Sequence, residues 1–286
     1  MTPPQPTPTD EMMDSLLSDV SHRLEAAPDQ RLREVMLALV RHLHGFAREV
    51  RLTEAEWMAG IAFLTETGQK SDDVRQEFIL LSDTLGLSSL IDLINHGSDD
   101  PRATAPTILG PFYVPDSPWR ENGSSMASYA DNGQPAVLRG RVLSTEGQPL
   151  AGAVVDAWQN SATGAYAVQQ PDVQGPENLR GRYRTGQDGR FEIRTVRPVP
   201  YSIPADGPVG RLLAATGRHP MRAAHIHAIV TAEGHRPLTT HVFDATSDYL
   251  DTDTVFGVKQ SLIRDFVPDG AGGVVCEADF VLEPQA

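Results

Sequence analysis

The chain has 286 residues, a formal net charge of −14 and a single cysteine, Cys276. This length can bury a sizeable core in one large domain or two moderate ones. The charge argues against nucleic acid, because phosphate binding requires a basic surface. No run of eighteen apolar residues is present, and the acidic, proline-rich start MTPPQPTPTDEMMD does not resemble a signal peptide. With one cysteine and hence no intramolecular disulfide, we expect a soluble cytoplasmic protein without a membrane partner.

The first hundred residues predict helices. Between residues 9 and 100 there is one proline, Pro28, and the apolar residues recur near helical spacing. Thr53 and Glu56 are placed for a capping box, and Ser71 or Asp72 can cap a later helix. The five expected helices cover 12–26, 29–46, 53–68, 72–86 and 87–96. Such a module could pack on the rest of the chain or form a dimer interface.

The remainder of the chain predicts short strands. Seventeen prolines and nineteen glycines follow residue 100, and links such as TEGQPLAG and TGQDGR are typical of turns. The expected strands cover 136–144, 151–159, 189–196, 223–232, 238–245 and 273–283. We therefore predict an α+β protein with a helical domain over 1–105 and a mainly antiparallel β-sandwich over 106–286. Neither a GxxxxGK loop nor a GxGxxG motif is present, so nucleotide chemistry is unsupported.

The stretch MRAAHIHAIV places His225 and His227 two residues apart in an apolar segment. On a strand such residues share one face, whereas His42 and His44 lie in a predicted helix, where the same spacing makes them diverge. A strand pair of this kind is either two satisfied polar side chains or part of a metal site, since imidazole is a common metal ligand.

A metal would need further ligands. A carboxylate such as Asp156 or Asp244 could complete a facial triad for Fe(II). Tyr166, in GAY, and Tyr201, in PYSIP, are the other oxygen donors, and phenolate favours a hard ion such as Fe(III). Arg222, three residues before the first histidine, is either a surface charge or a cation that stabilises anionic oxygen. Strand alternation places it away from the histidines unless the chain bends at the intervening alanine.

These motifs together resemble one family. DAWQ followed by GAY, PYSIP and RAAHIH in this order is similar to the intradiol ring-cleavage dioxygenases, in particular their catechol 1,2-dioxygenase branch. The helical part resembles the dimerisation domain of that branch, and ILGPFYV resembles the start of its catalytic domain. The resemblance implies a mononuclear non-haem Fe(III) held by Tyr166, Tyr201, His225 and His227. It also implies that Asp156 and the other carboxylates are not ligands.

The resemblance implies roles for three further features. Tyr201 would leave the metal and help to take up the protons of a catecholic substrate, and Arg222 would stabilise anionic oxygen. Oxygen insertion between the two hydroxylated carbons would then lead to a muconate. Ala223 stands where the family often has proline. His241, in THVF, stands where catechol dioxygenases usually have glutamine, and we count it with the catalytic residues.

The segments THVF and YLDTDTVFGV resemble those members of the family that cleave hydroxyquinol, benzene-1,2,4-triol, to 3-hydroxy-cis,cis-muconate, the tautomer of maleylacetate. The alternative is cleavage of catechol or chlorocatechol to cis,cis-muconates. Asp83 could accept a hydrogen bond from the third hydroxyl, or it could simply be a solvated helix residue. The substrate-binding residues implied by the resemblance are Leu80, Asp83, Ile108, Leu109, Gly110, Pro111 and Phe112.

The implied partners are the aromatic substrate, O2 and a second copy of the chain bound through the N-terminal helices, with a lipid between the subunits as a further expectation. Two other classes stay open on the residues alone. One is a non-catalytic β-sandwich that binds a ligand, and the other is a Zn or Fe(II) hydrolase that uses His225, His227 and a carboxylate. Tyrosinate bound to Fe(III) would make the protein red, whereas either rival would be colourless.

Overall fold

The computed structural model describes residues 7–72, 75–127 and 132–285. By the density of its internal contacts the chain forms two compact units, residues 1–65 and residues 66–286, which are described separately below. The functional division expected near residue 105 stays a prediction.

The first unit consists of helices whose starts are set by capping side chains. Its elements are α1 (Pro8–Leu24), α2 (Gln30–Glu49) and the greater part of α3 (Glu54–Lys70). The predicted capping box is present: the Thr53 N–H donates to Glu56 Oε2 at 2.9 Å, and the Glu56 N–H donates to Thr53 Oγ1 at 3.3 Å. Asp29 caps α2 by accepting from the Leu32 N–H at 2.7 Å. No residue of α1 or α2 is buried, so many of their apolar side chains are exposed.

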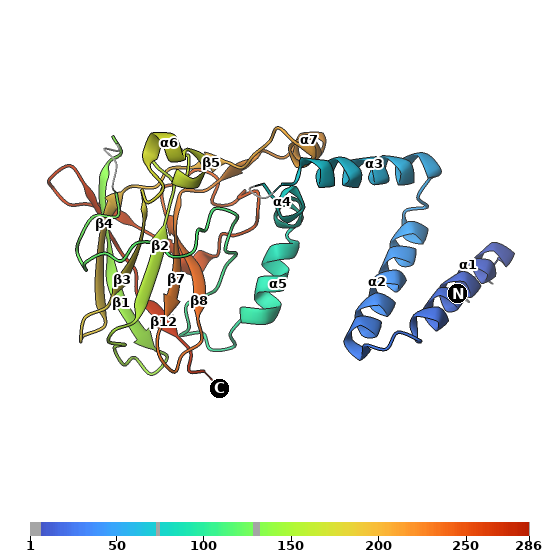
Figure 1. Ribbon diagram of the computed structural model, residues 1–286, viewed down its shortest axis with the longest axis horizontal. Helices are drawn as coiled ribbons and strands as arrows, with labels where there is room; N and C mark the ends of the chain where they lie inside the picture. The colour runs from blue at the N-terminus through green and yellow to red at the C-terminus, as the bar shows by residue number, and fades with distance from the viewer. Residues whose placement is uncertain (1–6, 73–74, 128–131, 286) are drawn as a thin grey trace, which may run out of the picture. The chain divides into compact units, whose positions relative to one another are not determined.

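The second unit begins with helices that adjoin the strands (Figure 1). They are α4 (Glu77–Thr84) and α5 (Leu87–His96), and two further helices, α6 (Pro171–Gln174) and α7 (Pro208–Ala215), lie between strands. The five predicted N-terminal helices are therefore present, but α4 starts five residues later than expected. The reason is local: the Asp72 carboxylate accepts from the Arg75 N–H at 2.6 Å and so does not cap the helix that begins at Glu77. Among the described residues, no helix is long and apolar enough to cross a membrane.

Two five-stranded sheets form the rest of this unit (Figure 1). The first has the order β10-β11-β1-β12, with β4 also paired to β1, and the second has the order β3-β2-β7-β8-β9. A short β5–β6 ribbon stands apart from both. Two single-turn 3-10 helices, η1 (Ala167–Gln169) and η2 (Gln260–Leu262), lie in the connections. The strands are β1 (Pro135–Ser144), β2 (Val154–Trp158), β3 (Arg180–Arg184), β4 (Arg190–Val196), β5 (Tyr201–Ser202), β6 (Met221–Arg222), β7 (His225–Thr231), β8 (Leu238–Asp244), β9 (Ile263–Arg264), β10 (Phe266–Pro268), β11 (Val274–Glu277) and β12 (Phe280–Leu282).

The predicted fold class is confirmed, with a mixture of strand directions. Most pairs are antiparallel, but β1 runs parallel to β11 and β12, and β8 runs parallel to β9. The segment predicted as one strand over 273–283 is divided into β11 and β12. At the break, β1 comes so close that a side chain on Gly140 would meet the Ala278 carbonyl. Strand β3 was not predicted, because its sequence RGRYR carries three arginines and only Gly181 and Tyr183 are buried.

The alternation of β7 separates the core from the site. Ile226, Ala228 and Val230 point into the main apolar core between the sheets, which they share with residues such as Leu138 and Ile193 of the other sheet. Burial of such a side chain contributes about 1.5–3 kcal/mol. His225 and His227 therefore point to the opposite face of their sheet. The apolar packing of β7 is what fixes the direction of both histidines.

Candidate active site

The two histidines are buried and flanked by aromatic rings from the neighbouring strands. In the sheet register, His227 lies opposite Trp158 of β2 and His241 of β8, and His225 lies opposite Phe243. The indole of Trp158 stacks on the His227 imidazole with 4.6 Å between ring centroids and 12° between planes. Three strands thus combine to hold the imidazoles in fixed orientations.

The donor atoms of the predicted ligands converge. His225 Nε2 lies 3.1 Å from His227 Nε2, which lies 3.1 Å from the Tyr166 hydroxyl. His225 Nδ1 lies 2.6 Å from the carbonyl oxygen of Ala223. That carbonyl can only accept, so Nδ1 carries the proton and the Nε2 lone pair is available to a cation.

Loops outside this sheet bring in the two tyrosines. Tyr166 follows the turn at Gly164, and its N–H donates to the Gln169 side chain at 2.9 Å. Tyr201 opens β5, and its ring meets the Tyr166 ring edge-on at 5.4 Å. Phe112 stacks on the Tyr166 ring at 4.6 Å. Both tyrosines are buried, at 3% and 5% exposure, although α6, β3 and β4 lie between them in the sequence.

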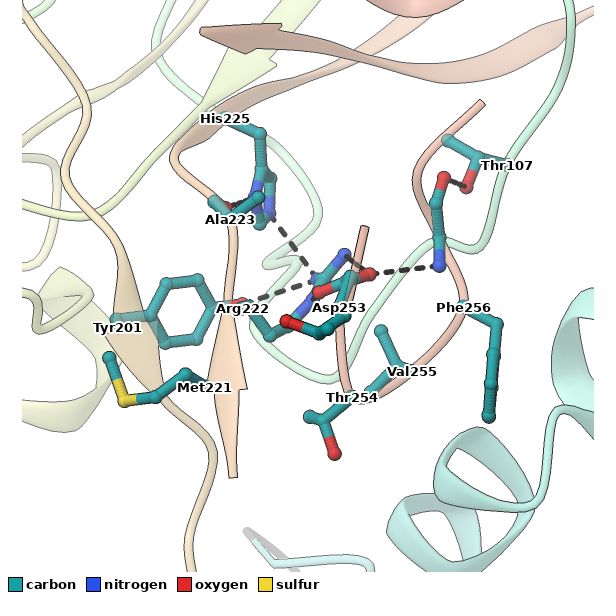
Figure 2. A network of polar contacts seen from close by, with 12 residues as sticks. Thr107, Tyr201, Met221, Arg222, Ala223, His225, Asp253, Thr254, Val255 and Phe256 are labelled. Atoms are coloured by element: carbon teal, nitrogen blue, oxygen red, sulfur yellow. Dashed lines mark hydrogen bonds and ion pairs between the residues drawn. The ribbon is translucent and has the colours of Figure 1, made fainter. Parts of the chain in front are cut away.

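Arg222 lies beside the histidines because the strand is interrupted. β6 ends at Arg222 and β7 begins at His225, so the simple alternation that would separate them does not apply. Arg222 Nη1 donates to the Tyr201 hydroxyl at 3.3 Å and lies 3.3 Å from His225 Nε2 (Figure 2). Its Nε donates to Asp253 at 3.1 Å. Sequence reasoning gave Asp253 no role, because nothing in the local pattern TDTVFG distinguishes it from a solvated acid.

Burial and charge set the protonation of these groups. Burial, and secondly the neighbouring Tyr201, raises the pKa of Tyr166 well above the ordinary value of tyrosine. Burial lowers the pKa of His225 and His227 well below the usual range, with further lowering by Arg222 and, for His227, by His225. For Arg222, burial acts to lower the pKa, but the charge of Asp253 and the two tyrosines outweigh it and raise the value. The imidazoles are therefore neutral, as a metal requires, and the arginine is charged.

His241 belongs to the same cluster. Its ring meets His227 edge-on at 4.1 Å and stacks on His225 at 4.6 Å. The available nitrogen atoms of the three histidines lie within 4.8 Å of one another. In the described part of the chain, neither ring nitrogen of His241 has a hydrogen-bond partner, apart from a weak polar contact with the Ile108 backbone, and His227 Nδ1 has none. Burial is the main cause that lowers the pKa of His241.

Some of the predicted substrate-binding residues lie beside the tyrosines and histidines. Leu80 and Ile108 are buried in one apolar cluster with both tyrosines, and a side chain on Gly110 would come within 3.3 Å of His227 Cε1. Asp83 is buried, which raises its pKa, and it is near enough to feel the charge of Arg222. Leu109 and Pro111 are exposed, so their contact with a substrate stays a prediction.

The two carboxylates first considered as ligands have other partners. Asp156 accepts from the Tyr113 hydroxyl at 3.2 Å, and Asp244 accepts from Arg197 at 2.6 and 3.1 Å. The site is thus a buried cluster of neutral imidazoles and phenols with one cation at its side. It can bind a hard metal ion and an anionic aromatic ligand.

This arrangement corresponds to a known family. The family model for "Dioxygenase" matches residues 108–284, and the model for "Catechol dioxygenase N terminus" matches residues 29–102. The chain belongs to the intradiol ring-cleavage dioxygenases and is therefore an enzyme of that class.

Individual relatives are similar over nearly the whole chain. A 6-chlorohydroxyquinol 1,2-dioxygenase of Cupriavidus pinatubonensis is 50% identical over 94% of this chain and 97% of its own. The solved structure of a hydroxyquinol 1,2-dioxygenase from Pseudomonas putida DLL-E4 is 46% identical, with a TM-score of 0.91 over 96% of this chain and 99% of that one. A catechol 1,2-dioxygenase of Candida albicans is 42% identical over 82% of this chain and 78% of its own.

Proposed function

We propose that the enzyme cleaves hydroxyquinol with O2 between its two adjacent hydroxylated carbons to give 3-hydroxy-cis,cis-muconate, the tautomer of maleylacetate. The observation that carries the substrate assignment is Asp83, a buried carboxylate within range of the Arg222 charge. Ser88 already donates to this carboxylate, but burial still raises its pKa, and the third hydroxyl of hydroxyquinol would be a further donor that catechol lacks. The names of the more similar relatives support the same assignment.

We also propose that Tyr166, Tyr201, His225 and His227 hold a mononuclear non-haem Fe(III). Ligands about 2.1 Å from an ion and about 90° apart are separated by about 3 Å. The pairs His225 Nε2–His227 Nε2 and His227 Nε2–Tyr166 Oη, both 3.1 Å, fit that spacing. A cation would also offset the burial that raises the pKa of Tyr166, and so make a phenolate ligand available.

When bound, the ferric ion would supply a Lewis acid that binds both oxygens of the diol and draws electron density from the ring. The chain's own residues do the rest. We propose that the Tyr201 hydroxyl oxygen, once ionised, accepts a substrate proton, while the Arg222 charge stabilises the anionic oxygen of the bound diol. We propose that a ring nitrogen of His241 donates a hydrogen bond to the same oxygen. The apolar cluster around Leu80 and Ile108 excludes water.

Oxygen uptake with hydroxyquinol, catechol and chlorocatechols tests this assignment. We expect the highest kcat/KM with hydroxyquinol. In Asp83→Leu the preference over catechol should fall by about 10-fold or more, because one hydrogen bond to a charged group contributes about 1.5–3 kcal/mol. A wild-type preference for catechol, or an unchanged preference in the variant, would contradict the role of Asp83.

We propose that residues 1–105 act as a dimerisation domain and residues 106–286 as the catalytic domain, and that two copies associate through the N-terminal helices. Large apolar side chains there are about half exposed: Leu39, Leu43, Phe46, Trp57 and Leu64. An exposed apolar surface of this kind is normally buried against a binding partner, which we propose is a second copy of the chain, with a lipid as a further ligand. Leu43→Glu should convert a dimer to a monomer in sedimentation velocity, whereas a wild-type monomer would contradict the proposal. Because a single cysteine cannot form an intramolecular disulfide, we also propose a cytoplasmic location.

A further inference from the structure

A buried ion pair lies directly behind the site, on the side of Arg222 that faces away from the tyrosine and histidine (Figure 2). Arg222 Nε donates to Asp253 Oδ1 at 3.1 Å, Nη2 approaches Oδ2 at 3.5 Å, and both side chains are 2% exposed. Nη1, the third nitrogen, contacts Tyr201 and His225. Because a guanidinium is rigid and planar, fixing its Nε and Nη2 also fixes where Nη1 points.

We propose that Asp253 is a positioning residue, which holds the Arg222 guanidinium so that Nη1 faces the reacting oxygen atoms. This inference rests on the proposed function of the site. Among the described residues, Asp253 makes no hydrogen bond to Tyr201 or to the histidines, and its hydrogen-bonded link to the site runs through Arg222 (Figure 2). Asp253 therefore begins a chain of contacts that runs from its carboxylate through the Arg222 guanidinium to the Tyr201 phenol and the His225 imidazole.

Asp253 can position another side chain because it is itself held in place. Its Oδ2 accepts from the Gly257 N–H at 2.9 Å, so the carboxylate closes a small loop of its own backbone. The loop is tied at both ends: Thr107 Oγ1 donates to the Gly257 carbonyl at 3.1 Å, and Arg218 donates to the Thr254 carbonyl at 2.7 Å. The carboxylate is therefore anchored by residues far apart in the sequence.

Gly257 packs closely against the ion pair. A methyl group on Gly257 would lie 2.9 Å from Arg222 Nη2 and 3.2 Å from Asp253 Oδ2. The backbone of Gly257 is not in the left-handed region, so an alanine there would act through contact and not through backbone strain. Gly257→Ala is therefore an independent way to displace the same guanidinium.

The chain offers a matched control. Asp244 is a second buried aspartate whose two oxygens accept from an arginine, Arg197, at 2.6 and 3.1 Å. Within the described structure, the Arg197 side chain contacts Asp244, Gln134, Thr246 and the Phe266 ring, none of which is a proposed ligand. Asp244→Asn is thus the same chemical change at a similar ion pair, and it reports the cost of losing such a pair for the fold alone.

The test compares iron-loaded wild type, Asp253→Asn, Gly257→Ala and Asp244→Asn. We expect kcat for hydroxyquinol to fall about 10- to 100-fold in the first two variants, as for a misdirected transition-state donor, with KM changed less than about threefold. Iron content and the visible absorption of the loaded protein should stay as in wild type. Asp244→Asn should keep kcat within about twofold. If Asp253→Asn does not fold, the kcat of Gly257→Ala tests the proposal instead, and an unchanged kcat in that variant would contradict it.

A double-mutant cycle separates positioning from general support of the fold. In an Arg222→Gln background, Asp253→Asn should lower kcat less than about twofold, because the group through which it acts is gone. The inference would be overturned if the double variant lost kcat by the product of the two single losses. It would also be overturned if Asp253→Asn and Asp244→Asn lost kcat equally, or if Asp253→Asn lost the visible absorption band. Wild-type protein that consumes no oxygen with any diol would instead overturn the proposed function.

Discussion

A substitution at Gly110 tests how closely the predicted substrate-binding segment 108–112 packs against His227, a proposed metal ligand. Its φ is +76°, and a Cβ there would lie 3.3 Å from His227 Cε1. Gly147 has nearly the same φ, +78°, but a Cβ there would meet nothing within 4 Å. Alanine at either position therefore carries the same backbone strain, about 1–2 kcal/mol, and only Gly110→Ala displaces the imidazole.

Both alanine variants should unfold at lower temperature, by about 2–4 °C per kcal/mol for a domain of this size. Only Gly110→Ala should bind iron more weakly, by about 10-fold, since disturbed contacts around a metal ligand cost about 10- to 100-fold in affinity. Thermal unfolding of the iron-free proteins and competition with a chelator measure the two effects separately. Wild-type iron affinity in Gly110→Ala, or an equal loss in Gly147→Ala, would refute the reasoning.

Three further predictions concern single buried side chains. Trp158→Leu should weaken iron binding more than Trp158→Phe, because phenylalanine retains a ring to stack on His227, a contact that contributes about 0.5–1.5 kcal/mol; equal losses in a chelator competition would contradict this. Burial raises the pKa of Asp83, so the folded state disfavours the ionised carboxylate. The protein therefore loses stability as the pH rises from the pKa of Asp83 in the unfolded chain to its higher pKa in the folded protein. Asp83→Asn should therefore raise the melting temperature at pH 7. The gain should fade as the pH falls from the raised folded pKa toward about 4 and be gone at pH 3, so a gain of equal size at pH 3 would contradict the assignment. Burial raises the pKa of the Cys276 thiol to about 12, so a thiol reagent at pH 8 should modify unfolded but not native protein, and rapid native modification would contradict that burial.

The helices, most strands and the face of β7 that carries the histidines follow from periodicity in the sequence. His225 and His227 share a face because Ile226, Ala228 and Val230 occupy the other one. That inference needs only the alternation of a strand. The residues alone offered Tyr166 and Tyr201 only as possible oxygen donors, and the family resemblance then implied that both are ligands, because no periodic pattern marks their positions.

Other parts of the site depend on long-range packing that no local pattern reveals. Arg222 reaches the histidines because the strand is interrupted between β6 and β7, whereas unbroken alternation would have separated them. Asp253 lies 31 residues after Arg222 and becomes its partner only when the chain folds back against it. Strand β3 was not predicted, because three of the five residues in RGRYR are arginines and the two buried positions, Gly181 and Tyr183, form no recognisable apolar pattern.

The visible spectrum of the iron-loaded protein tests the central claim most directly, because tyrosinate bound to Fe(III) absorbs visible light through charge transfer whereas histidine and carboxylate ligands do not give this band. We predict a red protein whose band disappears when Tyr166→Phe and Tyr201→Phe are combined. The double variant should remain folded, since each substitution removes only a hydroxyl group. A colourless iron-loaded wild type, or a band that survives in the double variant, would contradict the assignment of Tyr166 and Tyr201 as ligands.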